Sequence, residues 1–281
     1  MPLPFSKKIF LFALAAFFTT LAVSSTMVAG HLGSTVTCYS LTQPVTVDGK
    51  WTTKSEWNDT AETQLLVADG TAVGYFRVKH DATWLYILAE SLIDTSLDYD
   101  SANDASDYMG VFLDTVHNDG KSPASDDYRF VASWINASYT RVTTRKGDGA
   151  GWSETSPVEG VQAKIALDTD NSPHPPYPHV AGEFKIPLSI IAIGTFGFFI
   201  RFGDYSVILG TPGSLTKAFY WPGPSLADQS IDPSAWGNVS YSREPIPEFS
   251  STWLIIATSV LAVIVIFRLS KKTTTFHSVK Y

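Results

Sequence analysis

Aspartate crowds two stretches of the sequence, and this residue type at this density could bind a hard cation. Residues 94–107 hold five aspartates, and residues 114–127 hold four aspartates and Asn118. Calcium takes roughly six to eight oxygen ligands, and a divalent ion relieves the repulsion between neighbouring carboxylates. No EF-hand spacing is present, so a solvated acidic surface is the alternative. The sequence predicts calcium in these loops, with four candidate ligands: Asp114, Asp119, Asp126 and Asp127.

Tryptophan is the second residue type that could carry chemistry, because a flat aromatic face can stack on the apolar face of a sugar. The chain has eight tryptophans. Trp152 lies in a glycine-rich loop that does not need an indole for packing, and Trp221 lies in a rigid, proline-bounded loop. We interpret Trp152 and Trp221 as candidate sugar platforms, with loop or core packing as the alternative. Trp84 and Trp134 lie inside predicted strands and are expected in the core.

The sequence shows no motif of a catalytic site. The six histidines form neither a His-x-His nor a His-Glu-x-x-His pattern, and no Gly-x-Ser-x-Gly or phosphate-binding glycine loop is present. A carboxylate pair for glycoside cleavage is defined in space, so the many acidic residues carry no argument for one. We therefore predict a binding or structural protein that is not an enzyme.

The distribution of charge bears on the class of partner. The chain has 281 residues and a net charge of −7, with 44% apolar and 17% charged residues. Residues 48–248 hold all 27 acidic residues but only 14 of the 20 basic residues, so this segment carries a charge of −13. Such a charge disfavours polyphosphate partners and favours hard cations as counter-ions. No nucleic-acid partner is expected.

The elements that must position these residues are short strands rich in valine, isoleucine and aromatic residues, separated by polar turns. Their pattern predicts an all-β fold, an antiparallel β-sandwich over residues 45–242 that follows a lead-in at residues 31–44. One helical turn is expected at residues 54–58. The predicted strands span residues 63–67, 73–79, 84–90, 108–113, 128–134, 138–143, 161–167, 182–186, 196–204 and 237–241.

The N-terminus has the pattern of a secretory signal peptide over residues 1–30. Lys7 and Lys8 precede an apolar run of about 15 residues, which is shorter than the roughly 20 residues that span a bilayer. An uncleaved anchor is the alternative. Export also agrees with three glycosylation sequons in the predicted exterior segment, at Asn58, Asn136 and Asn238.

The C-terminus predicts a membrane anchor. A Pro-rich linker at residues 243–248 precedes an uncharged apolar stretch at residues 249–267, which is long enough for a transmembrane helix. A basic tail at residues 268–281 follows, and the positive-inside rule places this tail in the cytoplasm. We predict a single-pass cell-surface protein with its N-terminus outside and its C-terminus in the cytoplasm.

Pro247, Glu248 and Phe249, followed by the apolar stretch and the basic cluster, resemble the PEF-CTERM sorting signal of archaeal surface proteins. The resemblance implies processing by an archaeosortase-type enzyme. The polar residues 273–281 extend beyond the basic cluster, where such signals usually stop. A plain transmembrane anchor is the alternative.

The sequence Val47-Asp48-Gly49-Lys50-Trp51, followed by Glu56-Trp57, resembles the opening of family 9 carbohydrate-binding modules and their DOMON-like relatives. The resemblance implies a jelly-roll-like sandwich of two antiparallel sheets, sugar binding and structural calcium, and it does not imply catalysis. The likeness continues in order along the chain at residues 80–87, 107–114, 182–187, 202–204 and 236–239.

The DOMON-like relatives also include haem b proteins with methionine and histidine as axial ligands. Met109 with His174 or His179 offers such a pair, although strand packing is the simpler role for Met109. The leading hypothesis is a membrane-anchored module that binds carbohydrate, such as a cell-surface glycan, with calcium bracing its loops. The alternatives are a structural or adhesive surface protein without sugar binding and, third, a haem-bearing electron carrier.

Overall fold

A computed structural model of the chain describes residues 34–67, 70–191, 194–205, 215–223 and 230–243. These residues belong to one compact unit, residues 29–246. The predicted signal peptide, the sorting motif, the apolar stretch at residues 249–267 and the basic tail lie outside the described residues, as does the linker apart from Arg243. Within the described ranges, no helix has the length and apolar character needed to cross a bilayer.

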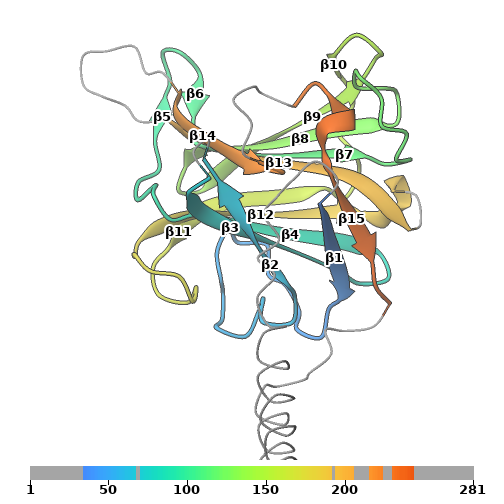
Figure 1. The fold of residues 1–281 in the computed structure, drawn as a ribbon. Helices are drawn as coiled ribbons and strands as arrows, with labels where there is room; N and C mark the ends of the chain where they lie inside the picture. Colours follow the sequence, from blue (N-terminus) through green and yellow to red (C-terminus); the bar gives the residue numbers. More distant parts are fainter. Residues whose placement is uncertain (1–33, 68–69, 192–193, 206–214, 224–229, 244–281) are drawn as a thin grey trace, which may run out of the picture. The chain divides into compact units, whose positions relative to one another are not determined.

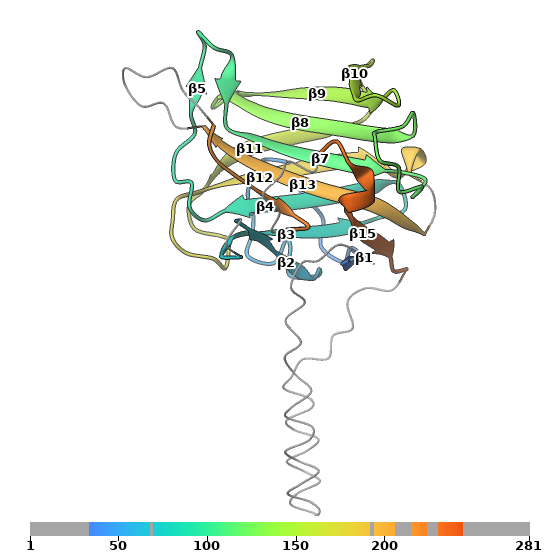
Figure 2. The ribbon, with the colours of Figure 1, turned by 45° about the horizontal axis from the view of Figure 1, so that its top comes forward.

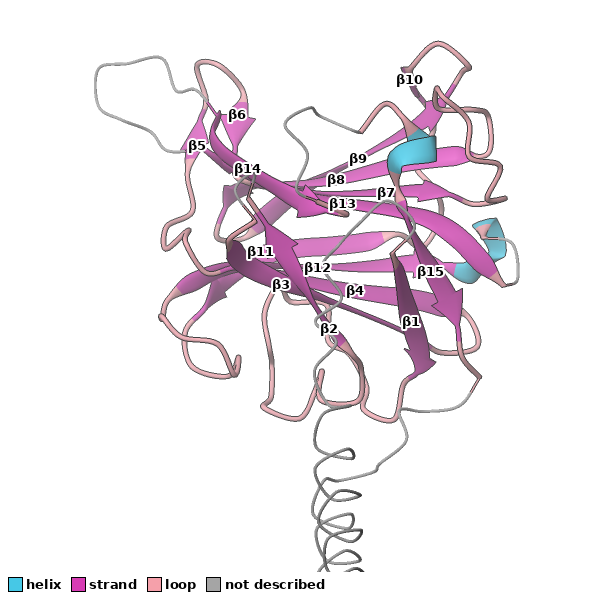
Figure 3. Cartoon of the chain, in the orientation of Figure 1, coloured by secondary structure: helices cyan, strands magenta, loops and turns pink. Residues whose placement is uncertain are grey.

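The described part is built from strands and loops, with two short 3₁₀ turns (Figure 3). The all-β prediction is confirmed, and each predicted strand overlaps an observed one: β2 (Glu62–Leu66), β3 (Ala72–His80), β4 (Trp84–Ser91), β7 (Tyr108–Asp114), β8 (Asp127–Asn136), β9 (Tyr139–Gly147), β11 (Gln162–Asp168), β12 (His179–Pro187), β13 (Thr195–Tyr205) and β15 (Gly237–Tyr241). The expected helical turn at residues 54–58 forms non-helical turns.

Seven further elements were not predicted: β1 (Thr35–Ser40), β5 (Tyr99–Asp100), β6 (Ala105–Ser106), β10 (Trp152–Glu154), β14 (Leu215–Trp221), η1 (Leu188–Ile190) and η2 (Pro233–Ala235). Strand β1 lies in the predicted lead-in, but it pairs in parallel with β15 and β3 and is therefore part of the sheet.

The strands form two layers packed face to face (Figures 1 and 2). One layer has the order β10-β9-β8-β7-β13-β14, and the other has the order β2-β3-β4-β12-β11. The layers join where Tyr220 of β14 pairs with Leu66 of β2, and pairing within each layer is antiparallel. A separate two-stranded hairpin, β5-β6, stands beside the first layer. The expected antiparallel sandwich is thus confirmed, with parallel β1 as an addition.

Strict alternation along the strands fills the space between the layers. On β13, Phe196, Phe198, Ile200 and Phe202 point inward and are fully buried, while the residues between them lie on the outer face. Successive side chains of a strand point to opposite faces, so each strand contributes every second residue to the core. Burying each large apolar side chain contributes about 1.5–3 kcal/mol before entropy costs. The residues in between are available to line a site.

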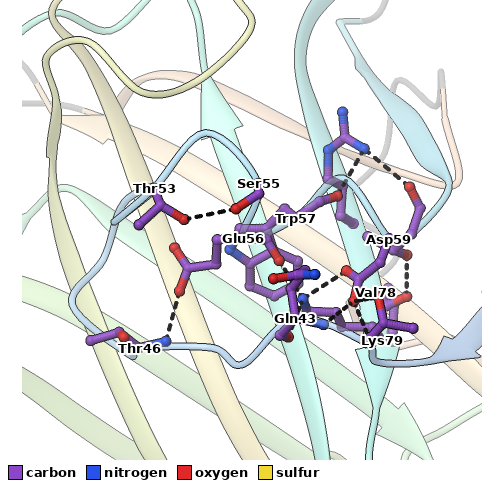
Figure 4. A network of polar contacts seen from close by, with 12 residues as sticks. Gln43, Thr46, Thr53, Ser55, Glu56, Trp57, Asp59, Val78 and Lys79 are labelled. Atoms are coloured by element: carbon purple, nitrogen blue, oxygen red, sulfur yellow. Dashed lines mark hydrogen bonds and ion pairs between the residues drawn. The ribbon is translucent and has the colours of Figure 1, made fainter.

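A second, smaller core covers the outer face of the β3-β4-β12 layer. Trp51 and Trp57 pack there against Leu88 and Ala181. We call the segment that carries Trp51 and Trp57 the covering segment. The Lys79 side chain is fully buried beneath it, and the Lys79 ammonium lies 2.8 Å from Asp59 Oδ1 and 4.9 Å from the Trp57 ring centre (Figure 4). A buried ammonium needs such partners, because desolvation otherwise favours its neutral form.

Glu183 of β12 holds the turn that begins this covering segment. Its carboxylate accepts hydrogen bonds from the backbone amides of Asp48 and Gly49, both at 2.9 Å, and from Trp57 Nε1 at 3.0 Å. Burial raises the pKa of Glu183 well above its ordinary value. Gly49 has φ +88°, and a Cβ there would lie 2.8 Å from the Ala166 backbone nitrogen, so only glycine fits. The Asp-Gly-Lys-Trp sequence is thus explained by packing.

Candidate functional site

A groove of about 500 Å³ lies on the outer face of the β9-β8-β7-β13 layer, and we call it the outer groove. This volume is in the range of small-ligand sites, roughly 300–1,000 Å³. Figure 2 shows this layer between the β5-β6 hairpin on one side and β10 on the other. The outer groove is lined by Asp104, Ala105, Ser106, Tyr108, Arg129, Val131, Ser133, Arg141, Arg145 and Tyr205.

The strand register sets the floor of the outer groove. Tyr108 of β7 lies opposite Ser133 of β8, which lies opposite Arg141 of β9. The Tyr108 ring lies over Gly203 of β13, where a Cβ would come within 2.2 Å of the ring. Glycine at this position therefore lets a flat aromatic ring lie on the sheet. The groove thus combines an aromatic face with hydroxyl and guanidinium groups.

The β5-β6 hairpin forms one wall of the outer groove. Asp104, at its tip, accepts two hydrogen bonds from Arg141 Nη1, at 2.8 and 3.0 Å. This contact holds the pKa of Asp104 below its ordinary value. The Tyr205 hydroxyl donates to Asp100 Oδ2 at 3.0 Å and ties the end of β13 to the same hairpin. The wall is therefore fixed to the floor by polar contacts.

An aromatic cluster closes the opposite end of the same face. Phe112 and Phe199 point outward from β7 and β13, and Trp236 covers them. Trp152 stacks on Trp236 with ring centres 6.3 Å apart, and its Nε1 donates to the Ser230 carbonyl at 3.0 Å. Trp152 is thus a partly buried packing residue at the end of this face.

Trp221 is a core residue, and this corrects the interpretation of its loop as a ligand platform. Its side chain is only 2% exposed and packs against Phe76 and Phe198, with ring centres 5.2 and 6.0 Å away. The reason is that β14 extends as far as Trp221, so strand alternation turns the indole inward together with Phe219. Pro222 follows only after the strand has ended.

Three of the four predicted calcium ligands come together at the end of β7, and we call them the first acidic cluster. Asp114, Asp126 and Asp127 each bring a carboxylate oxygen within 4.8 Å of the others. Asp127 Oδ1 is buried and has no hydrogen-bond partner among the described residues. Burial first, and then the charges of Asp114 and Asp126, raise the pKa of Asp127 to about 7 against the lowering effect of the Ala124 amide.

Asp119, the fourth predicted ligand, is placed differently. Its backbone amide donates to Asp114 Oδ2 at 3.0 Å, while its side chain is 62% exposed. Asp119 therefore orients Asp114 through its main chain and lies outside the group of converging carboxylates. The backbone of Asp119 has φ +53°, a conformation that aspartate tolerates in tight loops.

A second acidic cluster lies at the other end of β7. Asp94, Asp107 and Asp204 are buried, and their carboxylate oxygens lie within 4.8 Å of one another. Asp94 Oδ2 is buried without a hydrogen-bond partner in the described part of the chain. Burial and then the charge of Asp107 raise the pKa of Asp94 to about 8, and burial raises that of Asp107 to about 7. Asp107 Oδ1 accepts the Tyr205 amide at 2.7 Å, which links this cluster to the groove wall.

The structure separates the candidate haem ligands. Met109 is buried in the core, whereas His179 lies on β12 with its Nε2 3.1 Å from Glu90 Oε1. His174 stacks on Tyr75 at 4.0 Å and lies 2.6 Å from Glu62. Both imidazoles are thus engaged by carboxylates and are not paired with Met109.

The three sequons occupy different surroundings. Asn58 and Asn136 are exposed, as a glycosylation site requires. Asn238 is half-buried, and its Oδ1 lies 2.6 Å from His117 Nε2. Glycosylation at all three sites stays a prediction.

The similarity of this chain to known proteins is found at the level of three-dimensional structure. No protein-family model and no curated protein sequence matches the chain significantly. Among solved structures, the fold is similar to a family 9 carbohydrate-binding module from Caldicellulosiruptor kristjanssonii in complex with glucose, with TM-score 0.53 and 17% identity over 74% of this chain and 96% of that chain. The same kind of module in complex with cellotriose gives TM-score 0.54 and 18% identity over 76% and 97% of the two chains. The fold is therefore similar to that of family 9 carbohydrate-binding modules.

Proposed function

We propose that the protein is a carbohydrate-binding module of the cell surface and that its outer groove is the sugar site. The groove is the main observation behind this proposal, because it brings the Tyr108 ring, hydroxyls and guanidinium groups together around one concave site with a volume of about 500 Å³. An aromatic ring can bury the apolar face of a sugar, and the surrounding polar groups can bind its hydroxyls. The solved structures of similar fold hold glucose and cellotriose, which supports carbohydrate as the ligand class.

The experiment measures glycan binding by the full chain in detergent, on a glycan array and by affinity electrophoresis. We expect Tyr108→Ala to weaken binding by about tenfold, since loss of a buried aromatic contact costs about 1.5 kcal/mol or more. Tyr177→Ala is the matched control, because Tyr177 is 40% exposed and does not line the groove. Normal folding without retention on any glycan would overturn the proposal.

We further propose that calcium braces the two acidic clusters. Asp127 and Asp94 each have a buried oxygen with no hydrogen-bond partner among the described residues, and this supports the fit, because buried carboxylate oxygens without partners are costly and a hard cation supplies one. Asp114, Asp126 and Asp127 would hold one ion, and Asp94, Asp107 and Asp204 another. The ion would neutralise these carboxylates and tie the strand ends together. In the second cluster it would also fix Tyr205 at the groove.

Thermal melting tests the calcium proposal. We expect the melting temperature of the full chain to rise with micromolar to millimolar Ca²⁺ and to fall with a chelator, because a ligand of the folded state alone stabilises it by mass action. Asp127→Asn should reduce the Ca²⁺-dependent shift, whereas Asp170→Asn, outside both clusters, should leave it unchanged. A melting curve that is indifferent to Ca²⁺ would remove calcium from the proposal.

A specific observation supports the alternative of an adhesive or structural surface protein without sugar binding. Trp221 is buried, and Trp152 is packed on Trp236, so the indole rings of both predicted platforms serve packing within the protein. In that case the sandwich acts as a rigid spacer, and the glycan-binding experiment separates the two functions directly.

A further inference from the structure

We propose that Lys79 and Asp59 form an intramolecular isopeptide bond, a covalent modification that joins the end of the covering segment to β3. This inference is independent of the proposed sugar site. The Lys79 side chain is fully buried, the Asp59 side chain is 8% exposed, and Lys79 Nζ lies 2.8 Å from Asp59 Oδ1 (Figure 4). An amine and a carboxyl group held at this distance are a reactive pair, because fixed proximity replaces a bimolecular encounter.

The surroundings of Lys79 hold its nitrogen in place. Besides Asp59 Oδ1, the nitrogen donates to the backbone carbonyls of Gln43, at 3.0 Å, and Glu56. The Trp57 ring centre lies 4.9 Å away and closes one side of the site. Burial lowers the pKa of Lys79, although the hydrogen bond with Asp59 opposes this effect. A lowered pKa makes the neutral amine, which is the nucleophilic form, easier to reach.

The two oxygens of the Asp59 carboxylate have different surroundings. Oδ2 accepts hydrogen bonds from the backbone amides of Thr42, at 2.6 Å, and Gln43, at 2.7 Å, and from the Thr42 hydroxyl at 3.1 Å. Two backbone amides directed at one oxygen form an oxyanion hole, which stabilises the negative charge of a tetrahedral intermediate. Oδ2 is therefore the oxygen that would carry this charge. Oδ1, which faces the amine, is the oxygen that would leave.

The reaction balances within the pair. Burial by itself raises the pKa of Asp59, but the hydrogen bonds from Lys79, Gln43 and Thr42 hold it below its ordinary value, so the pair starts ionised. Lys79 gives one proton to Oδ1, and its neutral nitrogen attacks Cγ while Oδ2 takes the charge. A second proton then moves from the nitrogen to Oδ1, the Cγ–Oδ1 bond breaks, and one water leaves. The amide product keeps one N–H, and no oxidant, reductant or cofactor is consumed.

Burial favours the product over the ion pair. Two buried charges incur a large desolvation cost, whereas the amide is neutral and the released water is free to enter the solvent. The chain has a single cysteine, Cys38, so a disulfide within the chain is not available to brace the sandwich. A covalent link between residues 59 and 79 would constrain the unfolded chain in the way that a disulfide does.

Peptide mapping of the full chain tests the bond. The chain is produced in a bacterial host that adds no glycan to Asn58, incubated in its folded state in detergent, and then denatured and digested with trypsin. Without the bond, trypsin cuts after Lys79 and releases residues 55–77 as a free peptide. With the bond, Lys79 resists trypsin, and residues 55–77 and 78–121 form one species whose mass is one water less than their sum. Recovery of residues 55–77 only as the free peptide would overturn the proposal.

Variants test the chemistry. Lys79→Arg should abolish the cross-linked species completely. Lys185→Arg is the matched control and should retain it, because Lys185 lies in the same row of the outer face, across Tyr86 from Lys79, with its ammonium 4.3 Å from the Trp84 ring centre. A cross-linked species that persists in folded Lys79→Arg would overturn the proposal. The wild-type peptide map needs no variant, so it decides the question even if Lys79→Arg misfolds.

Asp59→Asn separates covalent chemistry from a simple ion pair. This variant should still form the cross-link, now with loss of ammonia in place of water, because an amide is also an electrophile. Burial without a carboxylate partner favours the neutral amine, so the reaction should be faster than in the wild type. Fragmentation of the cross-linked peptides should place the bond between residues 59 and 79 in both proteins. A folded Asp59→Asn variant without the cross-link would contradict the role assigned to Lys79 as nucleophile.

Discussion

His179 and Glu90 form a buried pair whose contribution to stability depends on pH. Both side chains are almost completely buried, and His179 Nδ1 also lies 2.8 Å from the Pro176 carbonyl. Burial by itself lowers the pKa of His179, but the hydrogen bond with Glu90 raises it above its ordinary value. The folded state thus holds the proton more tightly than the unfolded chain. The stabilisation is present below the unfolded pKa of about 6.5 and is lost as pH rises through the folded pKa.

We therefore expect His179→Gln to cost about 3 kcal/mol near pH 6 and clearly less near pH 9. Urea unfolding of wild type and variant at both pH values measures this difference. In the Glu90→Gln background, the pH dependence of the His179→Gln effect should disappear, because its charge partner is gone. An equal cost at both pH values would show that the imidazole is neutral throughout.

At the level of single residues, the sequence predicts the location of a side chain well where many residues of one type are close together in the sequence. It predicts the location poorly where this depends on the exact length and register of a strand. Asp114, Asp126 and Asp127 were predictable because carboxylates this dense had to meet near one strand end. The burial of Trp221 was not, since it depends on whether β14 reaches that residue. Arg129 and Arg141 were missed, although they alternate with buried residues in predicted strands. That alternation is the signal that could have placed them on one outer face.

Among the elements, the turn at Gly49 allows the covering segment to pack closely against the sheet. A Cβ at Gly49 meets the backbone of β11, whereas Gly149 has a similar φ of +89° and open space around it. Both Gly→Ala variants incur the strain of a positive φ, but only Gly49→Ala adds a clash. We expect Gly149→Ala to cost about 1 kcal/mol and Gly49→Ala at least about 3 kcal/mol, measured by urea unfolding. Equal losses of unfolding free energy in the two variants would mean that the β11 backbone moves to make room for the added Cβ.

Strands were predicted correctly where their own apolar residues mark them in the sequence. They were missed where the strand forms only because it pairs with a distant partner or is very short. The strands with long apolar and largely buried runs, such as β4 and β13, were recognised from sequence. Strand β1 was missed because its partners, β15 and β3, are distant in sequence and pair with it in parallel. The two-residue strands β5 and β6 are too short to show any period. Yet these missed pieces matter, since the β5-β6 hairpin forms a wall of the groove.

For the molecule as a whole, the two layers have different tasks. The β3-β4-β12 layer is covered by the segment that Glu183 and Lys79 hold, so its outer face is sealed. The β9-β8-β7-β13 layer leaves part of its outer face open as the groove. An open face of this kind agrees with a binding role. The proposal that the body lies outside the cell, tethered by residues 249–267, rests on the sequence alone.

Protease treatment of intact cells tests this topology. Residues 249–267 are an uncharged apolar stretch with basic residues directly after it, so the tail should face the cytoplasm and the sandwich the exterior. We expect added protease to cleave the exposed loops of the body, while an antibody against residues 268–281 detects a protected C-terminal fragment. Removal of the anchor by a sortase would instead leave a body that is cleaved on intact cells and has no tail epitope. A body that resists protease until the cells are lysed would contradict export, and with it the assignment of the groove to cell-surface glycans.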